Sequence, residues 1–344
     1  MPLLSNGRLL FNQVPKGYPI PGITTVYDES QTIDLENVPL EGGFLTKLLV
    51  ISVDPYLRGK MRESGSFSYS DAYIIGEPLY NYGVGVVVRS EHEGVRPGDH
   101  INGVFPFQEY IVSRNLDGFE ILDNAEKLPW SLYVGVAGMP GRSSYYAWKE
   151  YSAARKGDTV FISGGAGPVG SLVVQFAKVD GLKVIASAGT DDKVKFVQSL
   201  GADVVFNYKT TNTRDVLAKE GPIDIYWDNV GGEILEAALD NASVGARFIE
   251  CGMISGYNSP SYHIKNLIQI IARQLKLFGF LGNNPYLNEK YDKDFRQEIP
   301  KRLANGELKY NEDFTYGLKN AGQAILDVQT GRNFGKSIVV VSEE

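Results

Sequence analysis

The sequence contains very little cysteine and histidine. Its 344 residues include one cysteine, Cys251, and three histidines, His92, His100 and His263. A single cysteine excludes an intramolecular disulfide and is typical of a reducing compartment, so we expect a cytoplasmic protein. Zinc sites need several Cys or His ligands, and the three histidines stand in unrelated local sequences. We therefore predict that the protein has no metal site.

Long apolar runs and an excess of positive charge are also missing. No stretch of about 18 apolar residues occurs, so we predict no membrane span. The N-terminus lacks the basic region and the apolar run of a secretory signal. The net charge of −7 argues against nucleic acid as a partner, because nucleic-acid-binding proteins usually present a basic face. A small molecule is the expected partner.

The composition is otherwise that of a globular protein, with 43% hydrophobic and 22% charged residues. The length favours about two domains. The first 130 residues contain short β-branched runs at 45–53, 83–89 and 107–112, separated by turn-forming residues such as Arg96–Asp99. This pattern predicts a compact β-rich unit and is compatible with a partly open barrel.

From residue 131 the pattern changes to alternating strands and helices. Residues 131–155 predict helix, interrupted at Gly138–Gly141. The strands expected after it are 159–163, 183–187, 203–207, 223–227, 247–251 and 275–280, and the helices are 169–178, 193–200 and 233–241. Short strands alternating with helices predict a parallel, doubly wound α/β sheet, here over 131–310. A last strand at 336–341 is expected to return to the N-terminal β-rich unit, so that this unit comprises 1–130 and 311–344.

The glycine pattern Gly165-x-Gly167-x-x-Gly170 lies between an apolar strand and an apolar-faced helix, as a dinucleotide-binding loop requires. In such a loop the first glycine permits a tight turn, the second admits a pyrophosphate, and the third lets helix and strand pack closely. The helix N-terminus offers unpaired N–H groups to the phosphates. The pattern therefore predicts dinucleotide binding.

The end of the second strand indicates which dinucleotide binds. An NAD enzyme usually places an acid there, to hold the ribose 2′-hydroxyl. Here the strand ends in Ala188-Gly189-Thr190, and Lys193 follows within one turn, where it could pair with a 2′-phosphate. Asp191 and Asp192 follow directly and argue against NADPH if one of them holds the ribose. Alternatively, they are acids of the first helical turn, favoured by the helix dipole, with Thr190 as the cap. We predict NADPH.

Several segments together resemble one family. The chain is similar to the medium-chain dehydrogenases/reductases of the zinc-independent branch that includes the prostaglandin reductases and plant alkenal double-bond reductases. The segments are Asp54–Met61, Gly83–Val87, Gly138–Gly141, the glycine loop, Asp228–Gly232, Cys251–Ser255 with Tyr257-Asn258, and Asn333–Lys336. They follow the family order and span nearly the whole chain.

The resemblance implies a Rossmann nucleotide domain, a β-rich GroES-like catalytic domain built from both chain ends, a homodimer, and NADPH as cofactor. It implies reduction of the C=C bond of α,β-unsaturated aldehydes or ketones by conjugate hydride transfer. The cofactor contacts that it implies are Gly167, Pro168, Val169, Gly170, Lys193, Tyr208, Asn229, Cys251, Gly252, Met253, Ile254, Ser255, Tyr257, Phe280 and Asn333, and the strand-end residue Gly189 belongs with them.

Two tyrosines are the catalytic candidates. Tyr257 follows the fifth strand of the expected sheet, at the carboxyl edge where ligands bind, and a phenol can donate a proton to an enolate oxygen. Alternatively, Tyr257 only packs against the nicotinamide or the ribose. Tyr56, in Asp54-Pro55-Tyr56, is the second candidate, as a wall of the substrate pocket or as a simple core aromatic.

Other functions stay open at this point. A quinone reductase would share the fold and the cofactor, and relatives can also oxidise allylic alcohols. A non-catalytic NADPH-binding protein is the alternative outside the enzymes. The sequence identifies neither the physiological enone nor the proton source.

Overall fold

The computed structural model describes residues 3–260 and 262–344. The chain forms two compact units, one comprising Met1–Gly135 with Glu312–Glu344 and the other Val136–Asn311. The β-rich unit thus extends to Gly135, whereas the sequence placed its boundary at residue 130. The 3₁₀ helix η1 (Trp130–Val134) packs against β5 (Phe44–Ser52) and β6 (Tyr80–Ser90), which explains the later boundary.

The second unit contains a six-stranded, wholly parallel sheet with the order β12-β11-β10-β13-β14-β15. Its strands are β10 (Thr159–Ile162), β11 (Lys183–Ala188), β12 (Val204–Asn207), β13 (Ile223–Asp228), β14 (Ala242–Glu250) and β15 (Lys276–Gly279). The strand order reverses between β10 and β13, which is the switch point at which ligands bind in doubly wound sheets. The predicted α/β fold class is confirmed.

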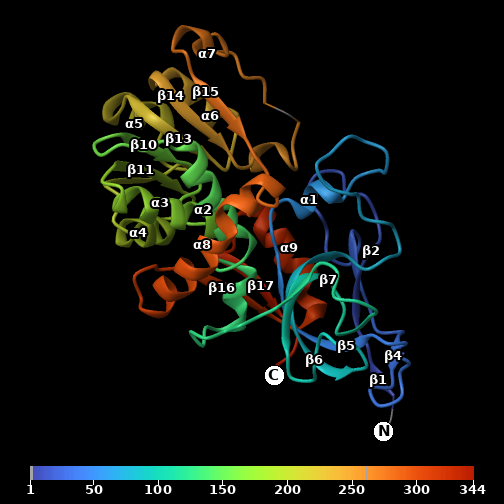
Figure 1. Cartoon of the computed structure of the whole chain (residues 1–344). Helices are drawn as coiled ribbons and strands as arrows, with labels where there is room; N and C mark the ends of the chain where they lie inside the picture. The colour runs from blue at the N-terminus through green and yellow to red at the C-terminus, as the bar shows by residue number, and fades with distance from the viewer. Residues whose placement is uncertain (1–2, 261) are drawn as a thin grey trace. The chain divides into compact units, whose positions relative to one another are not determined.

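Two groups of helices cover this sheet (Figure 1). In one group α2 packs against α3 and α8, and in the other α6 packs against α5 and α7. Their bounds, with α4, are α2 (Met139–Tyr151), α3 (Pro168–Val179), α4 (Asp191–Ser199), α5 (Thr213–Glu220), α6 (Gly232–Asp240), α7 (Ile268–Ala272) and α8 (Pro285–Ala304). Phe161 and Tyr226 stack between neighbouring strands with their ring centroids 5.3 Å apart, in the cluster that α6 covers.

The first unit is built around a seven-stranded sheet. Six strands follow the order β16-β17-β5-β6-β7-β9, and β8 pairs with β5. Besides β5 and β6 these are β7 (His100–Pro106), β8 (Tyr110–Ser113), β9 (Phe119–Ile121), β16 (Glu312–Tyr316) and β17 (Lys336–Val340). The antiparallel pairing of β17 with β5 confirms that the last strand returns to the N-terminal unit.

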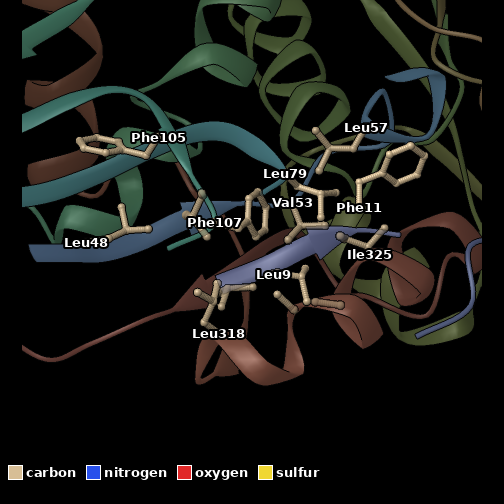
Figure 2. Close-up of a cluster of buried hydrophobic side chains, with 14 of the residues drawn as sticks. Leu9, Phe11, Leu48, Val53, Leu57, Leu79, Phe105, Phe107, Leu318 and Ile325 are labelled. Carbon is tan, nitrogen blue, oxygen red and sulfur yellow. The ribbon is translucent and has the colours of Figure 1, made fainter. Parts of the chain in front are cut away.

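Smaller elements complete the first unit. They are β1 (Leu4–Ser5), β2 (Arg8–Phe11), β3 (Thr25–Asp28), β4 (Thr32–Ile33), α1 (Leu57–Lys60), η3 (Leu318–Asn320) and α9 (Ala321–Thr330). Figure 2 shows the buried cluster in which several of them meet: Leu9 and Phe11 from β2, Val53 just after β5, Leu57 from α1 and Ile325 from α9 point toward one another. The core therefore holds both chain ends against β5.

The structure corrects two expectations about helices. The predicted break at Gly138–Gly141 is the start of α2, where Pro140 occupies the first turn, a position that tolerates proline. The long helix α8 was not predicted, because it is mostly polar and carries Pro300 in its interior. Within the described ranges, no helix has the length and apolar character needed to cross a bilayer.

Candidate functional site

The glycine loop joins β10 to α3 at the switch point of the parallel sheet. Gly167 is the N-cap of α3 and Pro168 begins the helix, and no side chain caps this end. A Cβ at residue 167 would meet only the Gly164 carbonyl oxygen, at 3.6 Å, which is ordinary contact. The chain itself therefore does not require glycine at 167, and a phosphate approaching the backbone is the remaining physical reason for it.

The other glycines differ partly from the prediction. The left-handed turn is made by Gly164 (φ +64°), whereas Gly165, which was expected to permit the turn, does not have a positive φ. Gly165 is needed for packing, because its Cβ would lie 3.1 Å from that of Ala186 on β11. At Gly170 a Cβ would lie 2.4 Å from the Gly164 carbonyl oxygen, as expected for close helix–strand packing.

The two acids after β11 both have local partners. Asp191 accepts a hydrogen bond from Asn207 Nδ2 at 2.9 Å, and Asp192 lies 3.0 Å from Lys195 Nζ. Thr190 caps α4 by accepting the Lys193 backbone N–H, as predicted. The acids therefore act as first-turn residues of α4, which leaves the ribose side of this strand end without a dedicated acid.

Tyr208 closes the same strand end. Its backbone N–H donates to the Ala188 carbonyl at 3.1 Å, and its hydroxyl lies 3.0 Å from the position that a Cβ would take at Gly189. Glycine at 189 thus makes room for the Tyr208 ring, which is 44% exposed. Gly189, Lys193 and Tyr208, three of the predicted cofactor residues, lie at or just beyond the carboxyl ends of β11 and β12.

Two loops from neighbouring strands dock onto each other at the carboxyl ends of β13 and β14. Gly231 and Gly232 both have positive φ, and a Cβ on Gly231 would lie 2.9 Å from the Met253 Cβ. Ser255 seals the contact, since its N–H and its hydroxyl both donate to the Val230 carbonyl, at 3.1 and 2.6 Å. Asn229 is fixed by Ser163, with its Nδ2 donating to the Ser163 carbonyl at 2.6 Å.

A buried carboxyl pair lies beneath these loops. Asp228 and Glu250 are direct partners in the register of β13 and β14, and Asp228 is fully buried. Asp228 Oδ1 accepts from Ser163 Oγ (3.2 Å), Tyr226 Oη (2.7 Å), Val230 N (2.7 Å) and Gly231 N (2.8 Å). In contrast, no donor among the described residues reaches Asp228 Oδ2 or either carboxyl oxygen of Glu250.

A proton on one Glu250 oxygen, shared with Asp228 Oδ2, would satisfy two of these three oxygens. Burial, and then the charge and hydrogen bonding of Asp228, raise the pKa of Glu250 to about 9. The protonated Glu250 can donate to Asp228, and Asp228 then holds the backbone of the Val230–Gly231 turn. Burial first, and then the charges of the same two acids, raise the pKa of Cys251 to about 12, which favours the protonated thiol at neutral pH.

The remaining predicted cofactor residues of this unit lie just beyond the ends of β14 and β15. Cys251 and Gly252 donate their N–H groups to the Asp228 carbonyl, at 2.9 and 3.0 Å, and η2 (Ile254–Gly256) leads to Tyr257. The half-buried Tyr257 places its hydroxyl 3.4 Å from the position that a Cβ would take at Gly252. Phe280, just beyond β15, lies edge-on to Trp227 with the ring centroids 6.0 Å apart.

Tyr56 and Asn333 belong to the β-rich unit. Tyr56 is half-buried and its hydroxyl donates to Asn81 Oδ1, so it is not merely a packed core ring. Asn333 Nδ2 donates to the Gly335 carbonyl at 2.9 Å, just before β17. The structure thus brings the other predicted cofactor residues together at one edge of the parallel sheet and describes these two within their own unit.

The donor set does not fit a zinc ion. His92 Nδ1 accepts the Gly94 N–H at 3.0 Å, and His100 stacks on Trp130 with ring centroids 3.8 Å apart. In the part of the chain that the structure describes, no three or more His, Cys, Asp or Glu side chains gather to hold a metal.

Sequence reasoning missed the residues that support the site. Ser163 and Asp228 hold the loops that carry Asn229 and Cys251–Tyr257, and Glu250 is the strand partner of Asp228. The available signal was one acid at the end of each of two adjacent apolar strands, because parallel strands place their carboxyl ends at the same edge.

Two family models match the chain. One, described as zinc-binding dehydrogenase, covers residues 168–301, and the other, described as N-terminal domain of oxidoreductase, covers residues 11–121. An NADP-dependent oxidoreductase from Cochliobolus heterostrophus is 36% identical over 350 residues, with 99% of each chain covered. An NADP(+)-dependent 2-alkenal reductase from Nicotiana tabacum is 36% identical over 347 residues, also with 99% of each covered.

A solved structure is similar over the whole chain. CurA from Vibrio vulnificus, in complex with NADPH, aligns with a TM-score of 0.88 and 30% identity, and the alignment covers 98% of this chain and 100% of that one.

Proposed function

This chain belongs to the medium-chain dehydrogenase/reductase family, and we propose that it is an NADPH-dependent reductase of the C=C bond in α,β-unsaturated aldehydes and ketones. The choice of NADPH rests on two features at the carboxyl edge of the parallel sheet. No side chain caps the helix that follows the glycine loop, and the acids after β11 are engaged with Asn207 and Lys195, so no dedicated acid faces the ribose. The relatives named for NADP and NADPH support the same choice.

The chain's own residues would hold this cofactor at both of its ends. The α3 N-terminus at Gly167–Gly170 would bind the pyrophosphate, and Lys193 would pair with the 2′-phosphate. Asn229 and the Cys251–Tyr257 segment, locked together through Val230, would enclose the nicotinamide end. When bound, NADPH would supply a hydride to the β-carbon of the enone, and a proton added at the α-carbon would complete the reduction.

Tyr257 is the group that we assign to the developing charge on the substrate oxygen. A hydrogen bond from its hydroxyl would stabilise the enolate, a role that otherwise needs a Lewis acid. Tyr257 lies just after η2, beyond the carboxyl end of β14, and a Cβ at Gly252 would lie 3.4 Å from its hydroxyl, so glycine there makes room for it. The 2-alkenal reductase from tobacco supports the substrate class.

The test compares substrates and one tyrosine variant. We expect the protein to oxidise NADPH with cinnamaldehyde and to yield the saturated aldehyde, and Tyr257→Phe to lower kcat about 100-fold with little change in NADPH affinity. Tyr316→Phe, at an exposed tyrosine of β16, is the control and should leave kcat unchanged. Turnover of a naphthoquinone alone would instead favour a quinone reductase. Failure to bind NADPH would favour a non-catalytic relative.

We also propose that the protein is a homodimer. Among the described residues the edge strand β15 pairs with β14 alone, and apolar side chains around it are exposed: Val244 (71%), Ile268 (66%), Ile271 (75%) and Leu277 (43%). An unpaired strand edge with exposed apolar side chains favours pairing with another chain. A second copy, meeting the first at this edge, would cover it.

A further inference from the structure

The hydroxyl of Tyr56 has a partner whose orientation is fixed by the residues around it. Tyr56 donates to Asn81 Oδ1 on β6. The amide of Asn81 is 1% exposed, and its Nδ2 donates to the Ser52 carbonyl at 2.8 Å and to Asp54 Oδ2 at 2.9 Å. Both of these partners can only accept, so the amide cannot be reversed. Its oxygen must face Tyr56, and Tyr56 must therefore donate its single proton to it.

A buried ion pair holds Asp54 in place. Lys336 on β17 is 2% exposed, and its Nζ lies 3.1 Å from Asp54 Oδ1. The same ammonium donates to the Val53 carbonyl at 2.8 Å and to the Ser337 carbonyl at 2.9 Å. All three of its donors are used, which is the condition under which a buried charge pair is tolerated.

The backbone around Tyr56 is fixed as well. Gln329 of α9 donates from Nε2 to the Pro55 carbonyl at 2.9 Å. Val53 and Leu57, on either side of the segment, point into the buried cluster shown in Figure 2. Strands β5, β6 and β17 and helix α9 thus all contribute to the placement of one tyrosine.

We propose that Asn81, backed by the Asp54–Lys336 ion pair, is a positioning residue that directs the Tyr56 proton inward and makes Tyr56 a hydrogen-bond acceptor toward bound molecules. Tyr56 then offers only lone pairs to a substrate and orients a donor group or a water molecule. It does not supply the proton, and that role is left to another group such as Tyr257. The inference rests on the proposed function in assuming that Tyr56 faces the substrate.

The electrostatics of the site agree with this assignment. Burial first, and then the charge of Asp54, raise the pKa of Tyr56 well above its usual value of 10. The phenol therefore keeps its proton across the working pH range, and the Asn81 oxygen always accepts a hydrogen bond from it. A tyrosinate at this position would lose that hydrogen bond.

A double-mutant cycle on activity tests whether Asn81 acts through the Tyr56 hydroxyl. We expect Tyr56→Phe and Asn81→Ala each to lower kcat/KM for cinnamaldehyde by about 5- to 10-fold, as for loss of one hydrogen bond. The double variant should be no worse than Tyr56→Phe alone. Losses that multiply in the double variant would overturn the proposal.

Asn102→Ala is the matched control. Asn102 is also a buried asparagine of this sheet, on β7, and its Nδ2 donates to the Gly83 carbonyl at 2.9 Å and to the Tyr133 carbonyl at 3.3 Å. Its loss should destabilise the unit comparably without any coupling to Tyr56→Phe. If Asn81→Ala does not fold, Asn81→Ser, which also ends short of the Tyr56 hydroxyl, takes its place.

A second measurement does not depend on activity. With ¹³Cζ-labelled tyrosine, the Tyr56 resonance is identified by its loss in Tyr56→Phe. Asn81→Ala should shift this resonance, and Asn102→Ala should not. A Tyr56 resonance that stays unmoved in Asn81→Ala would overturn the positioning role, whatever the activity. If the Tyr56 resonance shifts in Asn81→Ala but the natural protein reduces no enal, the proposed function is wrong and the positioning role still holds.

Discussion

Lys193 is the residue whose charge should distinguish the two nicotinamide dinucleotides. It lies in the first turn of α4, close to the end of β11, while Asp191 and Asp192 are engaged with Asn207 and Lys195. We expect Lys193→Ala to weaken NADPH binding about 10-fold or more and to change NADH binding little, because only NADPH carries the 2′-phosphate. Titration of both cofactors by fluorescence measures this.

Lys195→Ala is the control for Lys193. It removes a lysine two positions further along the same helix, one whose side chain is 74% exposed and paired with Asp192. Its effect on NADPH affinity should be small. Equal losses for NADPH and NADH in Lys193→Ala would contradict the assignment.

Glu250 should make stability depend on pH. Its pKa rises from 4.5 to about 9 on folding. Between these values the folded chain binds a proton that the unfolded chain has released, so the free energy of unfolding falls as the pH rises, by up to about 1.4 kcal/mol per pH unit. Glu250→Gln keeps a donor toward Asp228 and cannot ionise.

Urea unfolding at several pH values between 5 and 9 tests the Glu250 prediction. The Glu250→Gln variant should lose most of the slope and gain stability relative to the natural chain as the pH rises. Glu289→Gln, at an exposed glutamate of α8, should keep the natural slope. Parallel curves for the natural chain and Glu250→Gln would show that the carboxyl pair does not share a proton.

At the scale of elements, the loop between β10 and α3 contains one glycine expected to matter for cofactor binding and another expected to matter for stability. Gly167 has φ −74° and ψ 167°, a conformation open to alanine, and space for a Cβ. Gly167→Ala should keep Tm unchanged or slightly higher and weaken NADPH binding at least about 10-fold, because the Cβ would occupy phosphate space. Gly170→Ala should lower the unfolding free energy by about 1–3 kcal/mol through its clash with Gly164.

Calorimetry and NADPH titration on the two glycine variants check this separation. Normal NADPH affinity in Gly167→Ala would contradict the phosphate assignment. Normal Tm in Gly170→Ala would contradict the packing assignment.

The elements that the sequence predicted well are those with strong local patterns. The strands β10, β11 and β13 are short apolar runs bounded by turns, and each lies within a residue of its predicted limits. Helix α8 escaped prediction because only Leu287, Phe295, Ile299 and Leu303 of its 20 residues are buried. Its apolar stripe is too sparse to stand out from a charged sequence, and packing on α2 stabilises it.

For the whole molecule, the proposed homodimer predicts a concentration-dependent mass. Light scattering should give twice the chain mass, and Leu277→Lys with Ile271→Lys should give the single chain, because two charges would then be buried at the β15 edge. Val179→Lys, at an exposed apolar residue of α3, should leave the dimer intact. A natural chain with the mass of a monomer would exclude the proposal.

The sequence by itself determined the parallel α/β sheet, the glycine loop and the Thr190 cap, because these depend on neighbours close along the chain or on apolar runs. Tertiary structure alone decided which residues support the site. The register of β13 and β14 sets Asp228 beside Glu250. The pairing of β17 with β5 brings Lys336, 282 positions away in sequence, to Asp54, and so directs the proton of Tyr56. Such contacts follow from how strands align in space, and no local pattern encodes that alignment.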